Sequence, residues 1–310
     1  MLVFLRAVAF CALLLARAAL AADCPPPPRP FSPELFKQAA ATARDRGFLW
    51  SLTKDGRVSY LYGTMHMGRA EWMAPGPNLR QALRETEVLA LEVDVLDADI
   101  QRRMAAGLAK VKRVVPAPLQ ERLKAAWLAE CLQPEALASG PVDMHVMALS
   151  IAAGRRDGVG PEYASEVLLT LVARGAGRPV VSLEKPEDQL DAILSLDDAE
   201  VLGYLAEALD DLASGKARTA TAKTVAVWDT SDLAELARFE QWCECLNTPA
   251  EHKLMKRVLD DRNPGLARGI DELHTQGRKV LAAVGALHMV GPSGLPALLA
   301  ARGYQVKRLH

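Results

Sequence analysis

The sequence predicts an α/β protein of the mixed α+β kind, with helices surrounding a central mixed sheet. Short apolar segments typical of strands alternate with amphipathic segments typical of helices. The middle of the chain, about residues 97–177, is rich in Ala, Leu, Arg and Glu at helical spacing, which predicts a helical insertion. Two of the apolar segments also end in the same Gly-x-x-His pattern, so we expect a histidine-bearing loop at each of two strand ends.

Residues 1–21 have the three parts of a signal peptide. Arg6 is followed by an apolar stretch from Ala7 to Leu15, and Ala19-Leu20-Ala21 has the small residues that a signal peptidase requires. The apolar stretch is shorter than the ~20 residues that span a bilayer. We therefore expect cleavage near Ala21, a periplasmic or secreted protein, and no membrane span after cleavage. An uncleaved anchor is the alternative.

Charge and length limit the possible partners and domains. Loss of Arg6 and Arg17 with the signal changes the net charge from −1 to −3, and no basic run of the kind that binds nucleic acid occurs. The 289 residues left of the 310 suit one large domain or two small ones. We divide them into a Pro-rich lead-in with an N-terminal helix over residues 22–45 and a single domain over residues 46–310. The oligomeric state cannot be derived from these features.

Four cysteines remain after cleavage, and in an oxidising compartment they predict two disulfides with three possible pairings. They are Cys24, Cys131, Cys243 and Cys245. Cys243 and Cys245 are so close in sequence that we expect each to pair elsewhere. A four-thiolate zinc site is the alternative, although no Cys-x-x-Cys pair supports it.

The individual elements follow from apolar runs and from turn and capping residues. The expected strands are residues 48–52, 58–62, 88–93, 178–184, 279–284 and 303–309. Outside the insertion, the expected helices are residues 32–44, 78–85, 187–213, 263–275 and 294–301. In the helix of residues 263–275 we place Asn263 at the N-cap and Pro264 at the first helical position.

The paired Gly-x-x-His motifs are the most specific feature of the sequence. Residues 60–68 read YLYGTMHMG and residues 281–291 read LAAVGALHMVG, so each apolar strand leads into Gly-x-x-His-Met and another glycine. With 21 glycines and six histidines in 310 residues, about 0.4 such pairs would arise by chance. Ligand sites of open α/β sheets lie at strand ends. We therefore expect His66 and His288 to face one site.

Three further groups are candidates for the same site. Glu92 interrupts the apolar run of residues 89–93, where a charge must be paired or bound to a metal. Glu184 ends another apolar strand, and Arg262 with Asn263 precedes a helix, where both side chains can hold a carboxylate or an oxyanion. The structural alternatives are a hydrogen-bonded turn residue for each histidine, an ion pair with Arg262 for Glu92, and a helix cap for Glu184.

Several common enzyme signatures are missing. The chain contains no H-E-x-x-H, no G-x-S-x-G, no Walker A sequence and no G-x-G-x-x-G after a strand. Zincin, α/β-hydrolase, NTPase and Rossmann interpretations therefore lose support.

Taken together, these segments resemble the TraB/GumN (PrgY) family, which is related to the Tiki metalloproteases and to the erythromycin-esterase/ChaN-like group. The resemblance covers about residues 46–309, and the two Gly-x-x-His motifs are its most specific part. The other segments that carry it are Phe48-Leu49-Trp50, Leu91-Glu92-Val93-Asp94, Val181-Ser182-Leu183-Glu184 with Gln189, and Arg262-Asn263. Residues 158–162, Gly-Val-Gly-Pro-Glu, depart from the usual Gly-Leu-Asp, so no role passes to Glu162.

The resemblance implies a hydrolase that depends on a divalent metal, with manganese or cobalt favoured and zinc as an alternative. By this similarity His66, Glu92 and His288 are expected to be metal or catalytic residues, Glu184 a further ligand or general base, and Arg262 a catalytic arginine that steadies the oxyanion. The expected substrate is a peptide or another small molecule. Two alternatives stay open: a metal-free, esterase-like hydrolase in which histidine is the general base, and a protein that sequesters a peptide without cleaving it.

Overall fold

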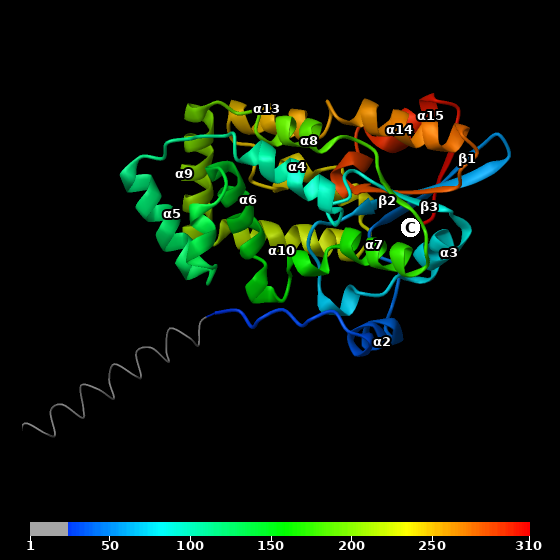
Figure 1. Cartoon of the computed structure of the whole chain (residues 1–310), viewed down its shortest axis with the longest axis horizontal. Coiled ribbons are helices and arrows are strands. Elements are labelled where there is room, and N and C mark those ends of the chain that lie inside the picture. Colours follow the sequence, from blue (N-terminus) through cyan, green and yellow to red (C-terminus); the bar gives the residue numbers. More distant parts are fainter. Residues whose placement is uncertain (1–23) are drawn as a thin grey trace, which may run out of the picture.

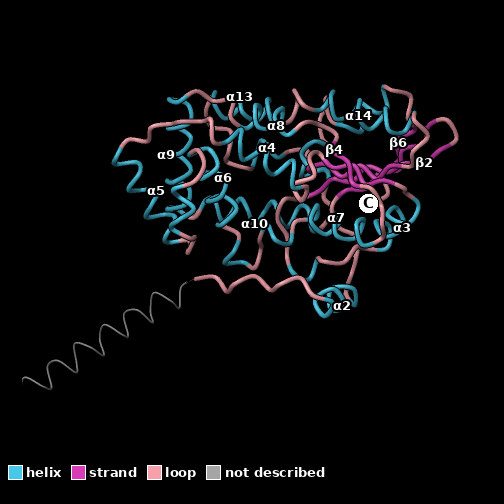
Figure 2. The backbone as a smooth tube through the Cα atoms, in the orientation of Figure 1, coloured by secondary structure: helices cyan, strands magenta, loops and turns pink. Residues whose placement is uncertain are grey.

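The computed structural model describes residues 24–310, so the expected signal peptide lies outside the described residues. Six strands form one mixed sheet in the order β4-β3-β5-β2-β1-β6 (Figure 2). The strands are β1 (Phe48–Lys54), β2 (Arg57–Thr64), β3 (Val88–Leu91), β4 (Val180–Ser182), β5 (Val280–Gly285) and β6 (Gln305–Arg308). All six expected strands and the mixed α/β class are confirmed.

The pairing of the strands brings four carboxyl ends to one edge of the sheet. Strands β2, β5, β3 and β4 run parallel, with Thr64 opposite Gly285 and Leu91 opposite both Ala283 and Ser182. Strand β1 is antiparallel to β2 and to β6. The β1–β2 turn uses Asp55 and Gly56, both at positive φ, as the Asp-Gly pair predicts.

Helices cover both faces of the sheet. In Figure 1, α14 (Asn263–Thr275) and α15 (Leu295–Ala301) lie on one face, whereas α3 (Pro77–Glu85) and α7 (Ser165–Gly175) lie on the other. β5 is buried along its whole length, and β3 is as well. Parallel strands covered on both faces read as continuous apolar runs, and these two strands have that pattern.

Most of the remaining helices form a lobe beside the sheet, and that lobe has a hydrophobic cluster of its own (Figure 1). Buried side chains of α5, α6 and α9 form this cluster, while α10 lies between it and the sheet core. These helices, and the others that complete the chain, are α2 (Pro33–Ala41), α4 (Ala98–Leu108), α5 (Ala117–Ala129), α6 (Val142–Ala152), α8 (Pro186–Ile193), α9 (Asp198–Ser214), α10 (Lys216–Asp229), α11 (Leu233–Leu236), α12 (Phe239–Trp242) and α13 (Pro249–Val258). Within residues 24–310, no helix has the length and apolar character that a membrane span requires.

The expected helix over residues 187–213 is two helices. α8 ends at Ile193, and α9 begins after Asp197, whose side chain accepts from the backbone N–H of Glu200 at 2.9 Å. The Glu200 carboxylate accepts in return from the Asp197 backbone N–H. This capping box satisfies the free N–H groups of a new helix start, and it is therefore the physical reason for the break.

Both disulfides expected from the cysteine count are present, but one pairing differs. Cys24 pairs with Cys131, and Cys243 pairs with Cys245. The expectation that Cys243 and Cys245 pair elsewhere was wrong. Glu244 between them has a φ of 52°, a turn that brings the two Cα atoms to 5.1 Å. Because all four thiols of the described residues are bonded in this way, they do not form a four-thiolate zinc site.

Candidate functional site

The four acidic and histidine side chains singled out in the sequence follow the carboxyl ends of four adjacent parallel strands. His66 lies two residues after β2, Glu92 directly after β3, Glu184 two residues after β4, and His288 three residues after β5. From the sequence we expected Glu92 to lie within a strand. In the structure β3 ends at Leu91, so Glu92 marks the point where this strand ends. Ligand sites of open α/β sheets lie at this edge.

Gly285, the last residue of β5, is the point on which the two histidines and Glu92 converge. A Cβ atom built on Gly285 would lie 3.2 Å from Oε1 of Glu92, 3.6 Å from Nε2 of His66 and 3.5 Å from Cδ2 of His288. The absence of a side chain keeps this space open between the three groups. The expected convergence of His66 and His288, which are far apart in sequence, is confirmed.

His66 is held by a partly buried carboxylate that sequence reasoning missed. Its Nδ1 lies 2.7 Å from Oε1 of Glu166, and the same oxygen accepts from the Thr64 hydroxyl at 2.6 Å. The neighbouring loop is pinned as well, because the Ser165 hydroxyl accepts from the backbone N–H of Met65 at 2.8 Å. With Nδ1 engaged, Nε2 is the nitrogen that His66 presents to the space beside Gly285.

His288 is oriented by Asn263. Nδ1 of His288 lies 2.6 Å from Oδ1 of Asn263, and the Asn263 amide nitrogen donates to the carbonyl of Ser293 at 2.9 Å. Because the amide oxygen faces the ring, we assign the proton of His288 to Nδ1, which leaves the lone pair on Nε2. Helix α14 begins at Asn263 with Arg262 at the N-cap, so the expected N-cap role of Asn263 was wrong. Its side chain is used by the histidine instead.

Glu92, Arg262 and Glu184 form a buried ion network. Arg262 contacts Glu92 through Nη2 and Glu184 through both Nε and Nη2, with the Nε bond at 3.1 Å. Oε1 of Glu92 accepts the backbone N–H of Gly285 at 2.7 Å. Gln189 bridges the two carboxylates, at 3.4 Å from Glu92 and 3.3 Å from Glu184. The side chains of the ion network are 9–11% exposed, so these charges depend on one another for compensation.

The guanidinium of Arg262 has its donors committed to protein groups. Nη1 donates to the carbonyl of Val258 at 2.8 Å and also lies 3.5 Å from Nε2 of His288, while Nε and Nη2 point to the two carboxylates. In this arrangement Arg262 positions Glu92 and Glu184 and has no N–H directed at a substrate. Glu184, in turn, directs both of its oxygens at Arg262.

The two histidines differ in their affinity for a proton. The carboxylate of Glu166 raises the pKa of His66 to about 9. Burial lowers the pKa of His288 to about 4, against the opposing effect of Glu92. Burial disfavours the charge on Glu92, but His288, His66, Arg262 and the Gly285 N–H outweigh it and hold the pKa of Glu92 well below its usual range. The edge of the sheet thus carries one charged and one neutral imidazole next to an ionised carboxylate.

The donor set fits a divalent ion in its chemistry. Once His66 gives up the proton that its pKa of about 9 retains, both histidines have Nε2 as a donor atom, and each has its Nδ1 held by a second side chain, as is usual for metal-ligating histidines. Nε2 of His288 is 3.9 Å from Oε1 of Glu92, and the position that a Cβ of Gly285 would fill lies among the three groups. Within residues 24–310, however, no three His, Cys, Asp or Glu side chains are already gathered as a metal site. Glu184 faces Arg262 and does not belong to this donor set.

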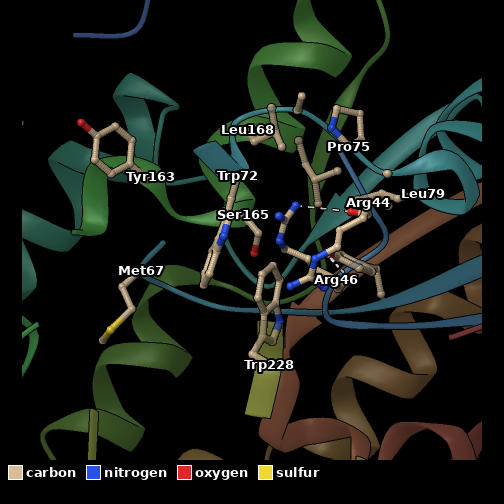
Figure 3. A pocket seen from close by; sticks show the side chains of 14 residues that line it. Arg44, Arg46, Met67, Trp72, Pro75, Leu79, Tyr163, Ser165, Leu168 and Trp228 are labelled. Carbon is tan, nitrogen blue, oxygen red and sulfur yellow. Dashed lines mark hydrogen bonds between the residues drawn. The ribbon is translucent and has the colours of Figure 1, made fainter. Parts of the chain in front are cut away.

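The site is accessible at His66, whereas His288 and Glu92 are buried. The His66 side chain is 68% exposed. Behind its loop lies a small cavity lined by Met67, Ser165, Trp72 and Trp228, among others (Figure 3). Its volume of about 20 Å³ accommodates no more than a single water molecule. A substrate must therefore approach the histidines from the open side.

Glu166 and Asn263 are the residues whose roles sequence reasoning missed. Glu166 stands in the first turn of α7, where an acidic residue is common for reasons of helix electrostatics alone. Asn263 reads as a helix cap, a role that the sequence pattern favours. Neither position carries a spacing signal that links it to a histidine.

Comparison with known proteins identifies a family. The model of the TraB/PrgY/gumN family matches residues 48–308, which span every strand of the sheet and all the site residues. The chain belongs to the TraB/PrgY/gumN family. The family resemblance expected from the paired motifs is thereby confirmed.

Similar proteins of this family have no assigned activity. The chain is 27% identical over 278 residues to the uncharacterized protein YbaP of Shigella flexneri, covering 84% of this chain and 96% of that protein. The YbaP protein of Escherichia coli K12 gives the same identity and coverage. No solved structure matches the chain.

Proposed function

We propose that this TraB-family protein is an exported hydrolase of the cell envelope that acts on peptides with the help of a divalent metal ion. The convergence of His66 Nε2, the imidazole ring of His288 and Glu92 Oε1 beside Gly285 is the observation that carries the proposal. His66, His288 and Glu92 would hold the ion, for which manganese or cobalt is preferred and zinc is an alternative. When bound, such an ion polarises a carbonyl oxygen and lowers the pKa of water.

The protein's own groups have separate tasks in this proposal. Glu166 and Asn263 each hold the Nδ1 atom of one imidazole, so that Nε2 is the ring nitrogen left for the ion. Arg262 keeps Glu92 ionised and in place, because the guanidinium compensates its buried charge. The missing side chain at Gly285 keeps a methyl group out of the space between these residues. Binding of a peptide at an open edge needs no preformed pocket.

One observation favours a second candidate, a hydrolase that works without metal. His66 with a pKa of about 9 and His288 with a pKa of about 4 form a pair of groups whose environments push their proton affinities apart. Such a pair can serve as general acid and general base. In that case the neutral Nε2 of His288 would accept the proton of an attacking water, and His66 would donate one to the leaving group.

Metal content and turnover distinguish these functions. The mature protein is stripped with a chelator, titrated with manganese, cobalt or zinc in a calorimeter, and assayed against a peptide library with and without each ion. We expect one ion per chain and metal-dependent cleavage, both of which are lost in His66→Ala and His288→Ala. His252, which is exposed and lies on α13, provides the matched control His252→Ala.

Three results would contradict the proposal. Cleavage that persists in chelator without bound metal would establish the metal-free hydrolase. Stoichiometric peptide binding without turnover would establish sequestration. Equal loss of cleavage in His252→Ala would show that the assay reports folding rather than the site.

A further inference from the structure

A second hollow of the molecule lies away from the histidines, between α2, α3 and α7. It is a half-open groove of about 350 Å³, within the size range of small-molecule sites. Its walls are almost entirely apolar, and the main contributors are Phe36, Ala40, Leu83, Val172, Ala173 and Ala176. In Figure 1 the three helices lie on the side of the sheet opposite α14 and α15. Phe36 leaves 38% of its surface exposed here.

Three arginines border the groove. Arg80 and Arg84 stand one turn apart on α3, and Arg178 lies between the end of α7 and β4. Across residues 24–310, none of the three makes an ion pair or a side-chain hydrogen bond, unlike Arg46, Arg113 or Arg262. Glu85 is next to Arg84 in the chain, but its carboxylate accepts from the Tyr60 hydroxyl and from Gln81.

This arrangement places three positive charges close together without an ion pair among the described residues. Two arginines at i and i+4 on one helix repel each other, and a third adds to that repulsion. The chain as a whole has a net charge of −1, so the three arginines are a local feature and not part of a generally basic surface. Planar guanidinium groups suit carboxylate and phosphate oxygens in particular. The rim is therefore complementary to an anion.

The groove and its rim together define one class of ligand. Apolar walls favour an acyl chain, because burial of apolar surface drives its binding. The arginines favour an anionic head at the end of that chain. We propose that this groove binds a single-chain anionic amphiphile, a fatty acid, with its chain between α2, α3 and α7 and its carboxylate at Arg80, Arg84 and Arg178.

The groove is separate from the candidate active site. α3 ends at Glu85 and α7 at Gly175, just before the amino ends of β3 and β4 respectively. The histidines and Glu92 lie beyond the carboxyl ends of the strands. Binding in the groove can thus be measured independently of metal or peptide at the other edge.

The test uses the full mature chain and the fluorescent fatty acid cis-parinaric acid, displaced by laurate or by dodecanol, which has the same chain and no charge. We expect displacement by laurate in the micromolar range and by dodecanol at least about tenfold more weakly. Two variants, the double substitution Arg80→Gln/Arg84→Gln and the single substitution Arg178→Gln, should each weaken laurate binding by about tenfold. Arg268→Gln, an exposed arginine of α14 without an ion pair, is the matched control and should leave the affinity unchanged.

A second pair of variants tests the apolar part. Ala40→Trp and Ala176→Trp place a large side chain in the groove from two different helices, and both positions are exposed, so the fold should tolerate them. Each should abolish laurate binding with an unchanged melting temperature. The proposal is overturned if laurate does not displace the probe, if dodecanol competes equally, or if Arg268→Gln weakens binding as much as the groove variants. Binding to phosphatidylglycerol vesicles without binding of laurate would also overturn it, since that result assigns the arginines to a membrane surface.

Discussion

Nδ1 of His66 lies 2.7 Å from Oε1 of Glu166, a residue 100 positions later in the chain. The contact joins the loop after β2 to the first turn of α7, and it determines which nitrogen of His66 faces the open edge. The Glu166 side chain is 16% exposed, whereas the imidazole is 68% exposed. A mostly covered anion thus controls the charge of an accessible histidine.

The first prediction concerns that charge. Glu166→Gln keeps the hydrogen-bonding shape and removes the carboxylate, so the pKa of His66 should fall from about 9 towards its ordinary value of about 6.5. In the metal-free wild type, His66 keeps its proton up to about pH 9; in the variant it should lose the proton near neutrality. NMR titration of the imidazole signals measures both. Glu162→Gln, four residues earlier, should leave the titration unchanged, and equal pKa values in Glu166→Gln and wild type would show that the contact is absent in solution.

The second prediction concerns the ion network. Arg262→Gln leaves Glu92 and Glu184 buried without their cation and should cost about 3–5 kcal/mol of unfolding free energy. Glu92→Gln leaves Arg262 paired with Glu184 and should cost less, roughly 1–3 kcal/mol. Urea unfolding gives both values. The reverse order would mean that Glu92, and not Arg262, is the centre of the network.

Acidification should reduce the loss of unfolding free energy caused by Arg262→Gln. In Arg262→Gln the buried carboxylates have no cation, which raises their folded-state pKa above the unfolded value. A raised pKa means that the folded state binds the proton more tightly, so the loss of stability is full at neutral pH and shrinks as the pH falls through the raised pKa. Unfolding curves between neutral pH and pH 4 check this sign. A constant deficit at every pH would exclude the carboxylates as its cause.

The third prediction concerns Asn263. Asn263→Ala removes the partner that holds Nδ1 of His288 and should lower manganese affinity by about 10–100-fold, the usual effect of losing such a supporting group. Ser293→Ala is the matched control, because the contact of Ser293 with Asn263 is made by its carbonyl oxygen, which the substitution keeps. Calorimetric titration with manganese compares them. Unchanged affinity in Asn263→Ala would remove His288 from the proposed ligand set.

The fourth prediction uses Gly285. Gly285→Ala adds a methyl group 3.2 Å from Oε1 of Glu92, within the space that the two histidines share. We expect metal binding and turnover to fall by at least about tenfold while the protein remains folded, because the methyl group occupies space that the metal ion needs. Gly203→Ala, on α9 with open space around it, should leave both unchanged. Full activity in Gly285→Ala would show that the reacting groups bind elsewhere.

The fifth prediction compares the disulfides. The Cys24–Cys131 bridge closes a loop with a sequence separation of 107, whereas Cys243–Cys245 closes one of 2. In the loop-entropy model the longer loop contributes more, within a range of about 2–5 kcal/mol, so Cys24→Ser/Cys131→Ser should destabilise more than Cys243→Ser/Cys245→Ser. Urea unfolding of the two double variants shows which one loses more unfolding free energy. Mass measurement after alkylation should find no free thiol in the mature wild type. Reactive thiols in that preparation would refute the pairing.

The sequence by itself determined the strands, the family and most of the site. Apolar runs mark the central strands β2, β3 and β5 because most of their residues are buried on both faces, and glycine followed by histidine marks the points where β2 and β5 leave the sheet. Glu92 was recognisable because a charge next to such a run requires compensation. These are local signals, readable from neighbours in the chain.

The tertiary structure decided which groups meet. Glu166 reaches His66, Asn263 reaches His288, and Arg262 reaches both Glu92 and Glu184, all across long stretches of chain. A hydrogen bond between distant residues depends on how helices pack against the sheet, and no spacing in the sequence records it. The pairing of Cys243 with Cys245 is local, but it depends on the positive φ of Glu244, which only the folded backbone reveals. Local patterns encode the strands and their ends, whereas partners brought together by packing appear only once the chain is folded.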